Sequence, residues 1–304
     1  MIHVTGGAGV LGFEILCHLA RLGPVTGISR SALPAPVPGA AHRRQADVLA
    51  ADWLEPGEEA ATIVHCAGLS DARARIEGVG DLVTREVLPQ TGFAEALLAR
   101  GWRGHLVYLS SAAVYGDSDD LPIPEPREPQ PKGFYALQKL MVENALLFLA
   151  AQHGFRLTLL RVANPYGGDQ PRRDRGVMRL LMDAADSGAE FTVYGGGTGL
   201  RDYLHMSDFL RAVERVCLRP PESRITRLNL GSGTGTALID LIPQLEAAAG
   251  RRLSLRHAPS QMEVKSSVLD ITRARDLLDW APRVGLEEGL ARMVARWRAT
   301  APQA

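Results

Sequence analysis

Short apolar runs alternate with amphipathic stretches over the first 160 residues of the chain. The apolar runs, each short enough for a strand, cover 2–5, 25–29, 62–66, 105–110 and 157–162. Helical patterns with a longer period lie between them, near 10–22, 81–100 and 134–152. Alternation of this kind is typical of βαβ units. The pattern therefore predicts an α/β protein with a doubly wound parallel sheet.

After residue 162 the alternation weakens and glycine-rich turns become frequent. Two proline-rich breaks, 33–40 and 121–131, read as extended loops, and Pro282 divides the helical tail. We expect a nucleotide-binding domain over 1–162, to which segments near 202–230 return. The remaining segments, 163–201 and 231–304, are predicted to form a smaller, mixed α/β substrate-binding domain.

Composition excludes several classes of function. The 304 residues carry 34 basic and 34 acidic side chains, so the net charge is zero, and no long basic run is present. Such a balance argues against a nucleic-acid partner. The three cysteines and eight histidines lack disulfide or metal-ligand spacing, and we expect no metal. With no apolar run of 18 residues and no leader-like start, we expect a cytoplasmic protein without membrane contact.

Glycines follow the first predicted strand. The stretch IHVTGGAGVLG places Gly6, Gly9 and Gly12 between an apolar strand and a helix that begins around Val10 and Leu11. Glycines here let the backbone approach a pyrophosphate, whose charge the helix N-terminus stabilises. Although the spacing is GxxGxxG instead of GxGxxG, the strand–turn–helix context predicts a Rossmann-type dinucleotide site.

The end of the second predicted strand bears on which dinucleotide binds. NAD sites carry an acidic residue there, but this stretch reads VTGISRS, with Ser29 and Arg30. A serine beside an arginine suits a 2′-phosphate, so we favour NADP over NAD; alternatively, Arg30 is a solvated loop cation. Asp47, at the end of the expected third strand, and Val48 are predicted to contact the adenine.

Tyr135 and Lys139 lie four residues apart at the start of an apolar helical run, FYALQKLMVENAL. Residues i and i+4 share one face of a helix. On a solvated face the pair would be unremarkable. Lining a nicotinamide pocket, it would be able to transfer protons.

Four motifs in order decide between these interpretations: GxxGxxG, VHCAG (64–68), SSAAVYG (110–116) and Tyr-xxx-Lys. Together they resemble the extended short-chain dehydrogenase/reductases and, more narrowly, the NAD-dependent epimerase/dehydratase family acting on nucleotide sugars. The resemblance implies that Tyr135 is the catalytic acid/base, that Lys139 also holds the nicotinamide ribose, and that Ser111 bonds the reacting oxygen. It also implies further cofactor contacts, at Cys66, Ala67, Gly68, Leu109 and Pro165.

The physical chemistry of a tyrosine base agrees with that role. A free tyrosine has a pKa near 10, so a base working near pH 7 needs a pKa about 3 pH units lower, which is roughly 4 kcal/mol. Lys139 and an oxidised nicotinamide would both favour the phenolate. Ala112 and Ala113 stand where relatives that perform 4,6-dehydration carry an acidic pair, so that reaction is not expected. SSAAVYGD instead resembles the nucleotide-sugar 4-epimerases.

For the substrate, FTVYGGGTGLRDYLHMSD is similar to the family segment whose arginine grips the nucleotide diphosphate, which would be Arg201. The alternative is that Arg201 pairs structurally with Asp202 or Asp208. Asn164 stands at the position that usually contacts the sugar diphosphate.

Two positions depart from the family pattern. Glu86 replaces an asparagine that often takes part in a proton relay, and the usual second phosphate-binding arginine before Asp270 is missing. Five basic residues are candidate substitutes, and the sequence does not choose among them: Arg172, Arg173, Arg175, Arg256 and Lys265.

The sequence leaves four functions open. A nucleotide-sugar epimerase, acting at C4 through a keto intermediate, is the first, and an NADPH-dependent ketoreductase of a 4-keto nucleotide sugar is the second. A non-catalytic dinucleotide-binding regulator would be expected to have lost Tyr135 or Lys139, and both are present. A reductase or lyase of a non-nucleotide substrate stays open because the second arginine is missing. The resemblance also implies a homodimer formed by the helices near 81–100 and 134–152, although their Leu- and Ala-rich composition equally suits burial against the sheet.

Overall fold

The computed structural model describes residues 1–68, 76–116, 118–169, 176–259 and 266–300. The chain divides into two compact units. Unit 1 consists of Met1–Val114, Pro129–Arg161 and Ala212–Leu228, and unit 2 consists of Tyr115–Glu128, Val162–Arg211 and Asn229–Ala304.

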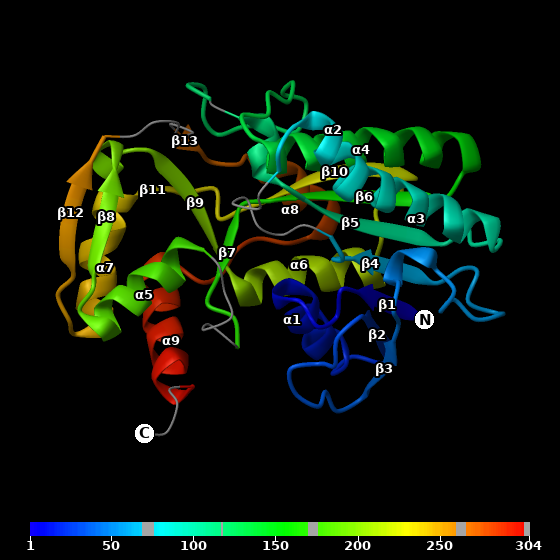
Figure 1. Ribbon diagram of the computed structural model, residues 1–304, viewed down its shortest axis with the longest axis horizontal. Coiled ribbons are helices and arrows are strands. Elements are labelled where there is room, and N and C mark those ends of the chain that lie inside the picture. Colours follow the sequence, from blue (N-terminus) through cyan, green and yellow to red (C-terminus); the bar gives the residue numbers. More distant parts are fainter. Residues whose placement is uncertain (69–75, 117, 170–175, 260–265, 301–304) are drawn as a thin grey trace. The chain divides into compact units, whose positions relative to one another are not determined.

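A seven-stranded sheet forms the centre of unit 1 (Figure 1). Its strand order is β10-β6-β5-β4-β1-β2-β3. The strands are β1 (Ile2–Thr5), β2 (Val25–Ser29), β3 (Ala40–Arg44), β4 (Thr62–His65), β5 (His105–Ser111), β6 (Arg156–Val162) and β10 (Ile225–Leu230). β1 pairs in parallel with both β2 and β4. The chain runs outward through β2 and β3 and then restarts at β4 on the other side of β1, and ligands bind at the carboxyl ends of the strands at such a reversal.

Helices flank this sheet. They are α1 (Val10–Leu19), α2 (Val79–Leu82), a π-helical turn (Val83–Val87), α3 (Leu88–Ala99), α4 (Phe134–His153) and α6 (Met206–Leu218). α3 and α4 lie side by side over β5 and β6, and α1 lies near α6 (Figure 1). His18 of α1 and Glu214 of α6 approach to 2.7 Å, which ties these two helices together.

The core of unit 1 explains why these segments fold as they do. The strand residues Ile28, Ile63, Leu106, Leu157 and Leu159 are almost fully buried and form one cluster with side chains of α3 and α4. Burial on both faces accounts for the continuous apolar runs in the sequence. α4 is long and apolar enough to span a membrane, contrary to the expectation from the sequence. In the structure α4 packs against α3 and β5, on one face of the sheet.

Unit 2 has a smaller, mixed architecture. Its strands are β7 (Asn164–Tyr166), β8 (Glu190–Tyr194), β9 (Leu200–His205), β11 (Gly235–Ala237), β12 (Ser254–Ala258) and β13 (Ser266–Ser267), and its helices are α5 (Val177–Ser187), α7 (Leu238–Ala249), α8 (Thr272–Leu278) and α9 (Leu286–Ala299). β9 pairs with β7, β11 and β13, and β8 pairs with β12. Residues of α5, α7 and α9 pack around Tyr166 and Tyr203 in a separate core.

The two units follow the sequence-based division in outline but not in detail. Tyr115–Glu128 groups with unit 2, although the sequence placed it in the first domain. The late segment that returns to unit 1 is Ala212–Leu228, so it begins about ten residues after the expected start near 202. That unit 2 binds the substrate stays a prediction.

Candidate active site

The glycine loop between β1 and α1 is closed so tightly that side chains are excluded from it. Gly6 has a φ of 71°, and a Cβ there would lie 2.8 Å from the backbone nitrogen of Ala67. A Cβ on Gly12 would lie 2.2 Å from the carbonyl oxygen of Gly6, and the N–H of Gly9 donates to that same oxygen at 2.7 Å. Val10 and Leu11 form the first turn of α1 and are half-buried. A bare backbone before a helix N-terminus fits a pyrophosphate.

A buried chain of polar groups positions the residues after β4. The N–H of Ala67 lies 3.4 Å from Thr5 Oγ1, which is 2.7 Å from His65 Nδ1. On the other side of the ring, His65 Nε2 lies 2.5 Å from Gln90 Oε1, an acceptor. Nε2 therefore donates to Gln90, and because burial lowers the pKa of His65 to about 4, the ring is neutral near pH 7 and Nδ1 accepts from the Thr5 hydroxyl. This chain, with Gly68 against the Gln90 side chain, fixes Cys66, Ala67 and Gly68 beside the glycine loop.

The end of β2 differs from the environment expected for a phosphate site. Ser29 is 3% exposed, and its hydroxyl lies 2.8 Å from both the Ser31 carbonyl and His42 Nε2. The single donor of this hydroxyl is therefore already in use. Arg30 is exposed, and its carbonyl accepts from Arg44 Nε at 3.1 Å. The side chains of Arg30 and Arg44 are both exposed at this end of the sheet.

The sequence suggested that Asp47 lies at the end of the third strand. In the structure it lies three residues beyond the end of β3. Its Oδ1 accepts from the N–H of Leu49 at 2.9 Å and caps a short 3₁₀ turn. Val48 is buried in the core of unit 1, so its side chain faces away from solvent. Asp47 is exposed and has a second carboxylate oxygen with which to contact an adenosine.

The structure brings the predicted catalytic residues together where β5 meets the start of α4. The Ser111 side chain lies close enough to Tyr135 to act on the pKa of its phenol. Lys139 Nζ donates to the carbonyl oxygen of Leu109 at 2.9 Å and lies 5.9 Å from the centre of the Tyr135 ring. Its ammonium also lies 4.9 Å from the centre of the Tyr108 ring. Tyr135 and Lys139 are only partly exposed, so the solvated-face interpretation is wrong.

Burial acts on both ionisable groups of this pair. It raises the pKa of Tyr135, and the Ser111 side chain acts in the opposite direction. Burial also lowers the pKa of Lys139 to about 8, although Cys66, Glu143 and Glu86 each act to raise it. Lys139 is therefore mostly charged at neutral pH and able to stabilise a phenolate. Burial raises the pKa of Cys66 to about 12, which leaves this thiol protonated.

Glu86, the departure from the family pattern, lies in the π-helical turn Val83–Val87. It is half-buried, and its charge acts on Lys139. The carboxylate of Glu86 acts to raise the pKa of Lys139, whereas an uncharged asparagine would not. π-helical turns occur frequently at functional sites.

Unit 2 carries the predicted substrate residues. Asn164 is exposed in β7, and its Nδ2 donates to the Asp202 carbonyl at 2.9 Å, while the neighbouring Pro165 is half-buried. Arg201 lies in β9, and Nη1 donates to the Leu200 carbonyl at 3.0 Å. The carboxylate of Asp202 accepts backbone N–H groups of Ser232, Gly233 and Leu269.

Asp208 is likewise engaged away from Arg201. It pairs with Arg211 at 2.5 Å, and its Oδ2 accepts the N–H groups of Arg283 and Val284. Both carboxylates proposed as alternative partners of Arg201 thus have structural tasks of their own.

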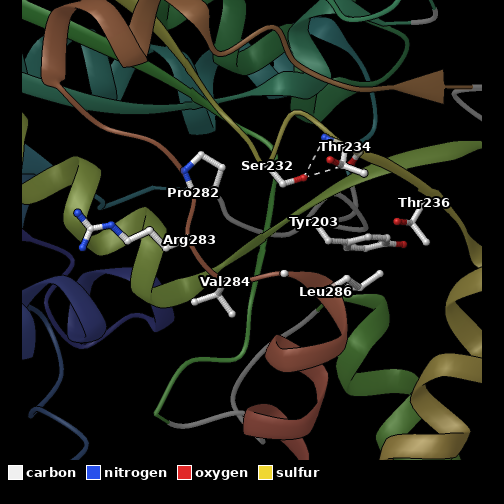
Figure 2. A pocket seen from close by; sticks show the side chains of 9 residues that line it. Tyr203, Ser232, Thr234, Thr236, Pro282, Arg283, Val284 and Leu286 are labelled. Carbon is white, nitrogen blue, oxygen red and sulfur yellow. Dashed lines mark hydrogen bonds between the residues drawn. The ribbon is translucent and has the colours of Figure 1, made fainter.

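Figure 2 shows a pocket of about 420 Å³ within unit 2. It is lined by Tyr203, Ser232, Thr234, Thr236 and the segment Pro282–Leu286. Arg201 faces Thr236 across β9 and β11 and precedes Tyr203 by two residues, so all three side chains share one face of the sheet. Burial raises the pKa of Tyr203 to about 12, and the charge of Arg201 acts against it. The pocket therefore combines hydroxyls with a nearby guanidinium.

Four of the five candidate substitutes for the missing second arginine cannot be placed. Arg172, Arg173, Arg175 and Lys265 lie outside the described residues. Arg256 is exposed on β12.

Two residues at the site escaped the sequence analysis. Glu143 of α4 and Arg161 of β6 form an ion pair at 2.6 Å, with side chains 1% and 3% exposed. Each is a lone charge within an apolar run, and such a charge requires a partner when buried. The sequence therefore indicates that each of these charges has a partner. Hydrophobic periodicity does not show that Glu143 and Arg161 are partners of each other.

The glycine loop after β1 and the Ser111–Tyr135–Lys139 group define a short-chain dehydrogenase/reductase. The chain belongs to the NAD dependent epimerase/dehydratase family, whose model matches residues 2–231. It is 27% identical to "UDP-glucose 4-epimerase 3" of Oryza sativa subsp. japonica over 94% of this chain and 86% of that protein. It is 26% identical to "dTDP-4-dehydro-6-deoxyglucose reductase" of Escherichia coli over 77% of this chain and 73% of that protein.

A solved structure, "MoeE5 in complex with UDP-glucuronic acid and NAD", has the same fold with a TM-score of 0.89. It is 26% identical and covers 99% of each chain. The likeness thus extends through both units.

Proposed function

We propose that this protein is an NAD-dependent nucleotide-sugar epimerase that inverts C4 of a UDP-hexose through a 4-keto intermediate. The observation that carries the proposal is the placement of Tyr135 and Lys139 one turn apart on α4, with the ammonium 5.9 Å from the Tyr135 ring and the Ser111 side chain acting on the same phenol. This is an acid/base site for a hydroxyl group. The epimerase relative and the UDP-sugar complex of MoeE5 support the substrate class.

The chain's own residues move and hold the proton. Tyr135 removes the proton of the C4 hydroxyl during oxidation and returns it during reduction from the other face. Ser111 donates to the reacting oxygen, and Lys139, held by the Leu109 carbonyl, stabilises the phenolate. Gly6, Gly9, Gly12 and the residues Cys66–Gly68 would hold the nicotinamide dinucleotide, which would supply reversible hydride transfer at C4 without being consumed.

Which nicotinamide dinucleotide binds depends on the end of β2. The sequence favoured NADP because of Ser29 and Arg30, but the Ser29 hydroxyl is buried and bonded twice. MoeE5 holds NAD. We therefore propose NAD, with NADP as the alternative that Arg30 and Arg44 would support.

The experiment that tests the function supplies UDP-galactose or UDP-glucose without added cofactor. The products are resolved by chromatography, and the nucleotide released on denaturation is identified by mass. Interconversion of the two sugars with NAD released in stoichiometric amount is expected. A cofactor-free protein that only consumes NADPH on a 4-keto sugar would instead establish the ketoreductase, which the Escherichia coli relative keeps as the second candidate.

Replacing Arg201 with alanine is expected to raise KM for the UDP-sugar about 10- to 100-fold, because a charged hydrogen bond to phosphate contributes about 1.5–3 kcal/mol. kcat should change little, because Arg201 is proposed to hold the diphosphate and not the reacting carbon. Steady-state kinetics separate the two parameters.

Arg252 provides the matched control. Its side chain is 94% exposed between α7 and β12, so Arg252→Ala removes the same charge without affecting the site. An unchanged KM in Arg201→Ala would point to a substrate without a nucleotide diphosphate.

We expect the protein to be a homodimer through α3 and α4. Leu88 and Phe148, on these two helices, are 56% and 64% exposed and so are available to contact a second copy of the chain. Sedimentation equilibrium should give a mass of two chains, and Phe148→Glu should shift it to one. A monomeric wild-type protein would contradict the expectation.

A further inference from the structure

Three residues of α4 form one stripe along the helix. Tyr135, Lys139 and Glu143 follow each other at intervals of four, so they lie on the same face. Each faces a different one of the last three residues of β5. Ser111 acts on Tyr135, Lys139 donates to the Leu109 carbonyl, and Ser110 donates to Glu143.

The third of these contacts extends into a buried ion pair. Arg161 Nε lies 3.1 and 3.2 Å from the two carboxylate oxygens of Glu143, and Nη2 lies 2.6 Å from Oε2. Arg161 belongs to β6, the neighbour of β5 in the sheet. Glu143 therefore connects α4 to two adjacent strands, and a fork of this kind fixes direction as well as distance.

We propose that Glu143, clamped by Arg161 and Ser110, is a positioning residue that sets the rotation of α4 and thereby aims Tyr135 and Lys139 at the reacting hydroxyl. The inference rests on the proposed function, in which these two residues are the acid/base pair. Glu143 touches neither substrate nor cofactor in this role. It acts through the helix and through its charge.

The clamp also has an electrostatic consequence for Lys139. Burial disfavours the ammonium, whereas the charges of Glu143 and Glu86 favour it, and the rings of Tyr108 and Tyr135 lie beside it. Removing the charge of Glu143 leaves Arg161 as an uncompensated buried cation. Lys139 should then lose its proton at lower pH.

The variant Glu143→Gln keeps the shape of the side chain and removes its charge. Its matched control is Glu58→Gln, because Glu58 is also a buried carboxylate of unit 1 bonded by a guanidinium. Arg43 Nη1 and Nη2 lie 3.0 and 3.1 Å from its two oxygens. Glu58 precedes β4, whereas the cofactor residues follow that strand, so this pair lies at the opposite end of the sheet.

The first measurement needs no sugar. The chain contains three lysines, Lys132, Lys139 and Lys265, so trace acetylation at varied pH followed by mass spectrometry reports Lys139 separately, with exposed Lys132 as an internal reference. In the wild type the labelling midpoint of Lys139 is expected near pH 8. In Glu143→Gln it should fall by about one pH unit, and in Glu58→Gln it should not move.

The second measurement is kinetic. In Glu143→Gln, kcat for epimerisation should fall on the order of 100-fold with little change in KM, the effect of misplacing reacting groups by about 1 Å. Glu58→Gln should lose comparable thermal stability and keep its kcat. If Glu143→Gln does not fold, the double variant Glu143→Met/Arg161→Met removes both charges and is expected to fold. The double variant should show the same loss of kcat.

An unchanged Lys139 midpoint in the folded variant, or equal effects of the two glutamine variants, would overturn the positioning role. Failure of the proposed function looks different. In that case the wild type would interconvert no nucleotide sugar, while the labelling comparison between the variants would still give its own answer.

Discussion

Replacing Tyr135 with phenylalanine is expected to lower kcat for epimerisation about 1,000-fold, within the range that general acid/base catalysis contributes. The substitution removes one oxygen atom. The ring stays beside Lys139, so cofactor binding and the fold should persist. Steady-state kinetics and fluorescence titration with NADH measure the two properties on the same sample.

Tyr108 supplies a demanding control for this prediction. Its ring also lies beside Lys139, and among the described residues its buried hydroxyl has no hydrogen-bond partner. Tyr108→Phe should therefore keep kcat within a few-fold of the wild type. A comparable loss in both variants would mean that any hydroxyl removed near Lys139 disturbs the site, and Tyr135 would lose its assignment as the acid/base.

The pH dependence of the wild type should reflect the same pair. Lys139 stabilises the phenolate only while charged, and its pKa is about 8. That contribution is complete below this pH and is lost as the pH rises through it. A base whose own pKa is raised by burial thus depends on neighbouring positive charge to work at neutral pH.

Local patterns in the sequence predicted the inner strands correctly and placed Tyr135 and Lys139 on one face of a helix. β1, β4, β5 and β6 are continuous apolar runs because both faces of the sheet are covered, and such runs are visible without a structure. Tyr135 and Lys139 were found because their relation is contained within one helix. Contacts between residues of one helix can be read from their spacing along the chain.

Features that depend on distant segments were not predictable in the same way. β3 (Ala40–Arg44) is an exposed edge strand of sequence AAHRR, which has no apolar period. The π-helical turn at Val83–Val87 leaves no signature in the hydrophobic pattern. The clamp of Ser110, Glu143 and Arg161 joins three elements, and only the sheet order β6-β5 brings its members together.

Ser29 shows why residue type alone does not decide which cofactor binds. A serine beside an arginine at the end of β2 matches a phosphate site in type and position. In the structure the Ser29 hydroxyl is turned inward, toward His42 of β3 and the Ser31 carbonyl. Residue type predicts what a side chain is able to bind, and burial decides whether the ligand has access.

Replacing Gly12 with alanine is expected to weaken NAD binding 10- to 100-fold, about 1.4–2.8 kcal/mol. Helix propensity alone predicts the opposite effect on stability, because alanine is favoured over glycine by about 1 kcal/mol inside a helix such as α1. The close approach outweighs that gain. A Cβ at Gly12 would lie 2.2 Å from the Gly6 carbonyl oxygen, and both partners are backbone, so the loop itself must move.

Gly92 separates the two effects. It lies inside α3, and a Cβ added there meets nothing within 4 Å. Gly92→Ala should raise the free energy of unfolding by up to about 1 kcal/mol and leave NAD binding unchanged. Isothermal titration and thermal unfolding of both variants measure this contrast. Unweakened NAD binding in Gly12→Ala would show that the cofactor does not depend on the bare backbone between β1 and α1.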